Sequence, residues 1–295
     1  MRLLALLWLI ATAEAQTLPQ ILSRISEEAD VFQHVAPELL AEETLTQRAA
    51  KPAGRFRPRV GAAAMKTTTG PLQTREITSE YSLGTLKDGS PSLHEFREVV
   101  TVDGRAVTSS ASARHSLVLG MSSSDDRAKK RMLEEFQKRG LSTAVVDFGP
   151  LLLLFMKRQI GNYHFELAGT DRMGADQVQV ISYRQISGPD RMLVFQGRRA
   201  IHQPIEGRIY ARVPDGLPLR ITITESRESG KHRFRDEATV DYVQNANGFV
   251  APAAVTHKGY GDDHLMVEDE FRYSPFRKFG ADAEIKFTVP PDPVK

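Results

Sequence analysis

Apolar and polar residues alternate with a period of two through most of the chain from Arg75 onward, the pattern of strands that bury one face. The run at 264–273 carries one apolar set, Leu265, Val267, Phe271 and Tyr273, and one polar or exposed set, Met266, Glu268, Glu270 and Arg272. Asp269 interrupts the apolar set. A carboxylate at that position must find a partner or lie at the mouth of a cavity.

Further period-two runs fall at residues 75–83, 94–102, 163–167, 178–180, 205–213, 219–223, 234–242, 249–258 and 283–289. The first two predict strands with one wet side, and the next four predict two hairpins. Pro214, Asp215 and Gly216 form a turn between the strands of the second hairpin. About nine strands joined by short turns favour an antiparallel sheet. The predicted fold class is α+β, mainly β: a curved antiparallel sheet or incomplete β-barrel with a few covering helices.

Helical periodicity covers residues 18–50, where the predicted buried stripe is Ile21, Ile25, Ala29 and Phe32. Pro37 opens a second predicted helix at 38–47, because proline suits the first helical turn. A third helix is expected at 125–139, capped by Ser124, with an apolar stripe of Ala128, Met132, Leu133 and Phe136. The most apolar stretch, 151–155, predicts a buried helical turn or a central strand.

The first fifteen residues have the three parts of a secretory signal: Arg2, the apolar block 3–11, and small residues at Ala13 and Ala15. The apolar block is about half of the roughly 20 residues that a membrane span needs. The predicted division is a signal peptide at 1–15, an N-terminal helical segment and basic linker at 16–60, and an antiparallel β domain at 61–295 with helices near 125–139 and 149–160. The mature chain is expected to be periplasmic or extracellular.

Composition excludes several chemistries. With no cysteine there is no disulfide, no thiolate metal site and no lipobox cysteine, so the chain is not expected to be a lipoprotein. Lys+Arg total 39 and Asp+Glu total 37, so the chain has no overall positive electrostatic potential that would attract nucleic acid. The basic residues of 51–59 indicate a solvated linker, with an anionic-ligand clamp as the alternative.

Catalytic and metal motifs are lacking. The histidines show no HExxH spacing, and neither GxSxG nor a P-loop occurs, so no catalytic residue, metal ligand or cofactor is predicted. Two weaker hypotheses stay open. The cluster Asp262, Asp263, His264, Glu268 and Glu270 has oxygens that could hold a cation, and Glu268 with Glu270 could form a carboxylate pair for sugar cleavage.

Two hairpins carry a resemblance to a known group. The segments 163–169 and 178–180, and the segments 207–210 and 216–220 with Gly216-Leu217-Pro218 before Arg220, resemble the outer-membrane lipoprotein-sorting (LolA-like) superfamily over roughly residues 75–290. The resemblance implies an incomplete antiparallel barrel whose helices cover an apolar cavity, used by relatives to carry acyl chains or to sense lipoproteins in the periplasm. The N-terminal helices and basic linker are additions to that pattern.

Three functions follow as hypotheses. The first is a periplasmic binding or carrier protein for an apolar, acylated ligand, such as a lipid or an acylated protein, with peripheral contact to the envelope. The second is an envelope interaction or sensory protein with a filled core, and the third is a cell-wall or glycan hydrolase. The predicted cavity lining for the carrier is Met132, Phe136, Leu153, Phe155, Ile209, Ile221, Phe234, Asp269 and Phe271.

Overall fold

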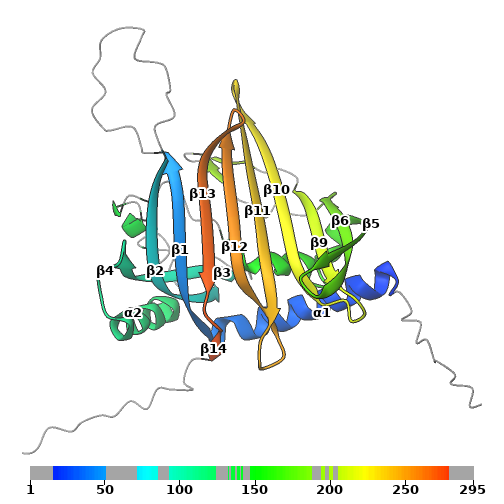
Figure 1. The fold of residues 1–295 in the computed structure, drawn as a ribbon, viewed down its shortest axis with the longest axis horizontal. Helices are drawn as coiled ribbons and strands as arrows, with labels where there is room; N and C mark the ends of the chain where they lie inside the picture. The colour runs from blue at the N-terminus through cyan, green and yellow to red at the C-terminus, as the bar shows by residue number, and fades with distance from the viewer. Residues whose placement is uncertain are drawn as a thin grey trace, which may run out of the picture.

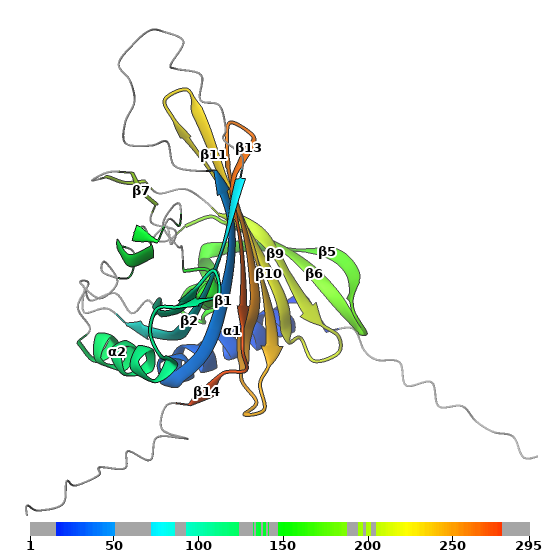
Figure 2. The same ribbon diagram turned by 60° about the vertical axis from the view of Figure 1, so that its left-hand side comes forward.

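The computed structural model describes residues 16–50, 72–85, 93–123, 132, 134–136, 138–139, 141, 147–187, 194–196, 199–201 and 205–278. A twelve-stranded antiparallel sheet dominates these residues, in the order β4-β3-β2-β1-β13-β12-β11-β10-β9-β6-β5, with β14 paired to β1. The sheet is curved and stays open between β4 and β5, and Figures 1 and 2 show it from two sides. This confirms the predicted fold class.

The strands of the main sheet have the following bounds: β1 Leu39–Ala50, β2 Leu72–Thr85, β3 Leu93–Val102, β4 Arg105–Ala106, β5 Tyr163–Met173, β6 Asp176–Gln185, β9 Glu206–Arg212, β10 Pro218–Ser229, β11 His232–Gln244, β12 Val250–Gly261, β13 His264–Tyr273 and β14 Arg277–Lys278. A separate two-stranded sheet joins β7 Val194–Gln196 to β8 Arg199–Ile201. The helical elements are α1 Leu18–Val35, η1 Ala36–Glu38, α2 Ser110–Ser123, η3 Gly149–Phe155 and η4 Ile160–Asn162. Both predicted hairpins are present, as β5–β6 and β9–β10.

Helix α1 lies across one face of the sheet (Figure 1) and buries the predicted stripe of Ile21, Ile25, Ala29 and Phe32. Its first turn begins at Thr17, whose backbone N–H donates to the Gln20 side chain at 2.8 Å. The periodicity of this segment therefore predicted both the helix and its buried face.

The second predicted helix, at 38–47, is wrong. Glu38 ends the 3₁₀ turn η1, and the chain then forms β1, a central strand between β2 and β13. Alanine, leucine, glutamate and glutamine favour helices, but pairing on both sides overrides that weak preference. The inward positions of β1 include the polar residues Glu43 and Gln47, which hid the period of two.

The expectation that β2 and β3 have one wet side is also wrong. Tyr81 on one face of β2 and Glu80 on the other are both fully buried, and Glu95 and Arg97 of β3 are buried as well. Helix α2, which lies in a stretch that the sequence left unassigned, packs on these strands, and its Arg114 pairs with Glu80 at 2.9 Å. The alternation of apolar and polar residues predicted that one face of these strands contacts water. Helix α2 covers that face and excludes the water.

The remaining predicted helices are described in part. Residues 132, 134–136 and 138 are helical, which agrees with a helix in the 125–139 stretch, and 151–155 forms the 3₁₀ helix η3 rather than a strand. The signal peptide, the basic linker at 51–59 and the strand at 283–289 lie outside the described residues. None of the helices that are described is long and apolar enough to cross a membrane.

Candidate functional site

Most of the predicted cavity-lining residues meet in one buried apolar cluster on the concave face of the sheet. The predicted residues that belong to this cluster are Phe136, Leu153, Phe155, Ile209, Ile221 and Phe271. Met132 is buried, and Phe234 is half-buried beneath the guanidinium of Arg227, whose Cζ lies 5.1 Å from the ring centroid. The structure thus brings these side chains to one face, and their use by a ligand stays a prediction.

The helix η3 covers part of that face. All seven of its residues are buried, and it packs between α1 and the strands β3 and β12. Its backbone is held at both ends. The Tyr242 hydroxyl accepts from Leu152 N–H at 3.0 Å and donates to Gly149 C=O at 3.1 Å, while the Ser26 hydroxyl donates to Phe155 C=O at 2.7 Å.

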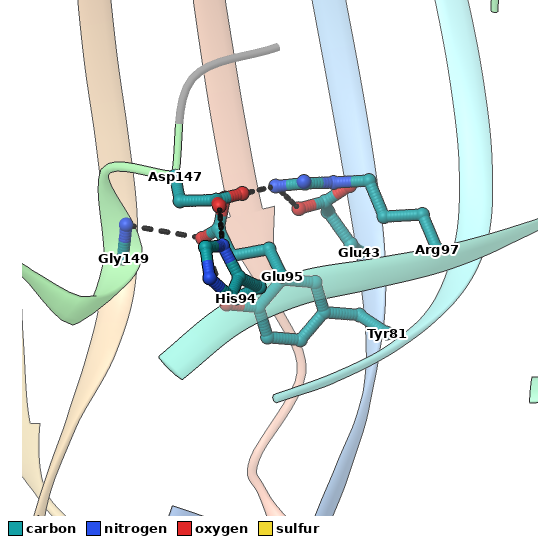
Figure 3. Close-up of polar contacts among 7 residues, drawn as sticks. All are labelled: Glu43, Tyr81, His94, Glu95, Arg97, Asp147 and Gly149. Atoms are coloured by element: carbon teal, nitrogen blue, oxygen red, sulfur yellow. Dashed lines mark hydrogen bonds and ion pairs between the residues drawn. The ribbon is translucent and has the colours of Figure 1, made fainter. Parts of the chain in front are cut away.

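A buried group of charges, the Arg97 cluster, fixes the start of η3 to the sheet. We define it as Glu43, Tyr81, Glu95, Arg97 and the Gly149 N–H (Figure 3). Arg97 donates to both oxygens of Glu43, at 2.7 and 2.8 Å, and to Glu95 at 2.9 Å. The other Glu95 oxygen accepts from the Tyr81 hydroxyl at 2.8 Å and from Gly149 N–H at 3.0 Å. Every carboxylate oxygen in the cluster therefore has a donor.

Next to the cluster, His94 Nδ1 lies 3.0 Å from Asp147 Oδ2, which adds a second link between β3 and the segment entering η3 (Figure 3). Burial opposes the charge of Arg97, but Glu43 and Glu95 outweigh it and raise the pKa of the guanidinium. Burial likewise raises the pKa of the Tyr81 phenol. Arg97 is thus a fixed cation between two carboxylates, and this arrangement holds the backbone of η3 at Gly149 against the sheet.

A second polar group crosses the concave face nearer the hairpin tips. We call it the His257 row: Glu225, Asp236, His257, Asp269 and Gln47, one from each of the adjacent strands β10, β11, β12, β13 and β1. His257 lies between two acids, with Nδ1 3.0 Å from Asp269 and Nε2 3.1 Å from Asp236. Gln47 donates to the other Asp269 oxygen at 2.6 Å. Asp269 is therefore a partnered buried acid.

The His257 row holds a charged imidazole. Burial disfavours the imidazolium, but hydrogen bonds to Asp236 and Asp269 outweigh that effect and raise the pKa of His257 to about 9. The ring also packs against Phe148, with centroids 4.8 Å apart. At neutral pH the histidine is thus a cation between carboxylates, which makes it a poor general base.

Glu225 differs from the rest of the row. It is 2% exposed, and neither carboxylate oxygen has a hydrogen-bond partner in the part of the chain that the structure describes. Burial raises its pKa to about 7. None of the predicted site residues is Glu225, Asp236, His257, Glu43 or Arg97. A usable signal existed for two of them, since Glu225 continues the inward phase of Ile221 and Ile223, and Asp236 falls between Phe234 and Ala238.

The carboxylates proposed for sugar cleavage and cation binding lie elsewhere. Glu268 pairs with Arg48 at 2.6 Å and with Lys258 at 3.3 Å, and Glu270 is exposed beside Arg272. Asp262 accepts from Arg233 N–H at 2.9 Å and contacts His232 in a turn. Within the described part of the chain, no group of three or more histidine, aspartate or glutamate side chains is arranged to hold a metal ion.

A polar groove of about 650 Å³ lies over β6 and β9, away from the predicted lining residues. Its lining includes His164, Arg184, Glu206 and Arg208, which are exposed. Such an open, charged surface offers no apolar enclosure.

Comparisons with known proteins find matches among solved structures only. The sequence matches no family model and no curated protein. Among solved structures, a domain described as outer membrane lipoprotein-sorting from Vibrio parahaemolyticus matches with a TM-score of 0.36 and 10% identity, covering 89% of this chain and 94% of that one. A LolA superfamily protein from Nitrosomonas europaea matches with a TM-score of 0.33, 11% identity and coverage of 87% and 92%. A DUF1329 family protein from Desulfovibrio piger matches with a TM-score of 0.33, 9% identity and coverage of 90% and 95%.

The structural matches include the superfamily that the hairpins suggested. At such low identity and TM-score they supply no ligand, partner or activity for this chain.

Proposed function

We propose that this chain is an exported, periplasmic binding or carrier protein that holds an apolar, acylated ligand on the concave face of its open sheet. Its ligand would be a lipid or an acylated protein, met at the periphery of the envelope. The observation that supports this function is η3, a short segment of four leucines and a phenylalanine that covers the apolar face where the predicted lining residues lie.

The apolar face can be covered by η3 or by an acyl chain, and the two would gain similar free energies of burial. Burying a leucine or phenylalanine side chain is worth about 1.5–3 kcal/mol, so the five apolar side chains of η3 contribute roughly 8–15 kcal/mol. A ligand gains about 0.8 kcal/mol for each buried CH₂, so a chain of about 16 carbons gains roughly 13 kcal/mol. An acyl chain could therefore replace η3 on the face at little net cost, which is what reversible loading requires.

The test is photo-crosslinking with a fatty acid that carries a diazirine near its tail. Peptide mapping of the labelled protein should find label on Leu153, Ile209, Ile221 or Phe271. Native mass spectrometry of protein purified from its exporting host should show an added lipid mass. A clean apo mass together with label confined to exposed residues such as Met266 would overturn the proposal.

The filled-core interaction protein is the second candidate, and one observation favours it. The predicted lining residues belong to the same buried cluster as the rest of the core. In-cell crosslinking would support this alternative if it captured one defined envelope partner from protein that takes up no fatty acid.

A further inference from the structure

Glu225 is a buried acid that has no hydrogen-bond partner among the described residues, and the half-buried Arg227 beside it lacks one hydrogen bond there. Glu225 is 2% exposed, and within the described ranges neither of its oxygens accepts a hydrogen bond. Nε of Arg227, two residues along the same strand, likewise has no acceptor within those ranges. Arg227 Nη1 is 3.9 Å from Asp236, and its guanidinium lies over Phe234. Every carboxylate oxygen in the Arg97 cluster, by contrast, accepts a hydrogen bond.

The charges around Glu225 leave one negative charge unbalanced. The described groups here are the carboxylates of Glu225, Asp236 and Asp269, and the cations Arg227 and His257. Asp236 and Asp269 share His257, and Arg227 lies toward Asp236. An ionised carboxylate buried without a partner is costly, so Glu225 either stays protonated or receives a cation from elsewhere.

The row borders the apolar part of the same face. On each strand the next inward residue toward the apolar part is apolar and buried: Ile223 after Glu225, Ala238 after Asp236, and Val255 after His257. A molecule lying along the strands would thus meet apolar surface with one end and Glu225 with the other. This is the environment of an amphiphile with a polar head.

We propose that the His257 row is a head-group site for a cationic amphiphile, with Glu225 as the acceptor of a primary ammonium and Asp236 beside it. This inference rests on the proposed function for the tail, which would lie on the apolar face that η3 covers. A primary ammonium is favoured because it supplies the missing positive charge and several N–H donors in a compact group. A fatty-acid head would instead add a fourth carboxylate.

The experiment compares dodecylammonium, dodecanoate and dodecanol by calorimetric titration, and uses butylammonium, observed by saturation-transfer NMR, as a probe of the head site alone. The measurements are made at about pH 8, above the pKa of about 7 of Glu225. The variant is Glu225→Gln, which keeps the shape and removes the charge. The matched control is Glu228→Gln, an exposed acid on the same strand.

The wild type and Glu228→Gln should bind dodecylammonium about tenfold or more tightly than dodecanoate, the size expected for a charge-assisted hydrogen bond. Glu225→Gln should lose that preference without a fall in melting temperature, because glutamine removes the buried charge that costs stability at this pH.

Each other outcome has a definite meaning. Equal binding of the three dodecyl compounds by the wild type and by Glu225→Gln would overturn the head-group site and leave the carrier standing. Glu225-dependent binding of butylammonium alone, with no dodecyl compound bound, would support the site and overturn the carrier. No binding of any probe would overturn both.

Discussion

The Arg97 cluster and the His257 row lie on the same concave face and are built in the same way, from charged residues at inward positions of neighbouring strands. They differ in how completely they are paired. Arg97 donates to both oxygens of Glu43 and to one oxygen of Glu95, and the other Glu95 oxygen accepts from Tyr81 and from the η3 backbone. The His257 row pairs Asp236 and Asp269 with one imidazole, and Glu225 accepts no hydrogen bond from any residue that the structure describes.

The difference separates a structural device from a candidate binding site. A buried charge group whose carboxylate oxygens all accept hydrogen bonds holds its neighbours in place, and removing its cation leaves those carboxylates without a counter-charge. A buried acid that is unpaired gives nothing to stability and is retained at a cost. The comparison predicts opposite responses to mutation in the two places.

The largest effect is expected at Arg97. Arg97→Met keeps an unbranched apolar stem but leaves Glu43 and Glu95 buried without a cation, which should lower the free energy of unfolding by about 3–5 kcal/mol. Urea denaturation measures it. Arg48→Met is the control, since Arg48 pairs with Glu268 while 53% of its own side chain is exposed, and it should cost about 1 kcal/mol or less. Equal losses in the two variants would contradict the assignment.

The next effect is a fall in stability with rising pH, caused by the His257 row. Glu225, which faces Asp236 and Arg227, has its pKa raised by burial from 4.5 to about 7, so the folded state keeps a proton that the unfolded chain has lost. Stability is therefore lost between about pH 4.5 and 7. His257, between Asp236 and Asp269, has its pKa raised to about 9, so its contribution is complete below about pH 6.5 and lost as pH passes 9.

Each of these two groups accounts for up to roughly 3 kcal/mol, because one pKa unit corresponds to about 1.4 kcal/mol. Unfolding titrations across the pH range should show Glu225→Gln flattening the lower window and His257→Gln the upper one. His232→Gln is the control, because that histidine is exposed and pairs only at the surface with Asp262. Unchanged pH profiles in both row variants would show that the row does not titrate as proposed.

The smallest effect concerns the anchor of η3. A Cβ at Gly149 would stand 2.5 Å from a Glu95 oxygen and 2.9 Å from the Tyr81 hydroxyl, so Gly149→Ala should push η3 off the Arg97 cluster. We expect a loss of about 1–3 kcal/mol in stability and faster uptake of a fluorescent fatty acid. Gly161→Ala, where a Cβ meets nothing within 4 Å, is the matched control. Slower or unchanged uptake by Gly149→Ala would mean that η3 does not cover the ligand face.

Segments with a regular hydrophobic period were predicted correctly, and segments whose buried positions carry polar residues were not. The stripe of α1 and the hairpin β9–β10 were predictable because each buries one face, which leaves a clear period in the sequence. The hairpin β5–β6 also follows the predicted alternation, although Tyr163 is the only buried residue of β5. Strand β1 was not predictable, because its inward residues Glu43 and Gln47 are polar and its composition suits a helix. The buried phase of β3 was hidden in the same way by Glu95 and Arg97.

The sequence alone determined the fold class and placed most of the apolar candidate residues on one face, since hydrophobic periodicity is a local property of the chain. It also singled out Asp269 as a carboxylate on an apolar face. Only the tertiary structure decided what such charges do. Asp269 is hydrogen-bonded to His257 and Gln47, Arg97 is paired with two glutamates, and Glu225 has no hydrogen-bond partner among the described residues. Such partners come from strands as far as 222 residues apart in the chain. The pairing of a buried charge is decided by neighbours across the sheet, and no local pattern records them.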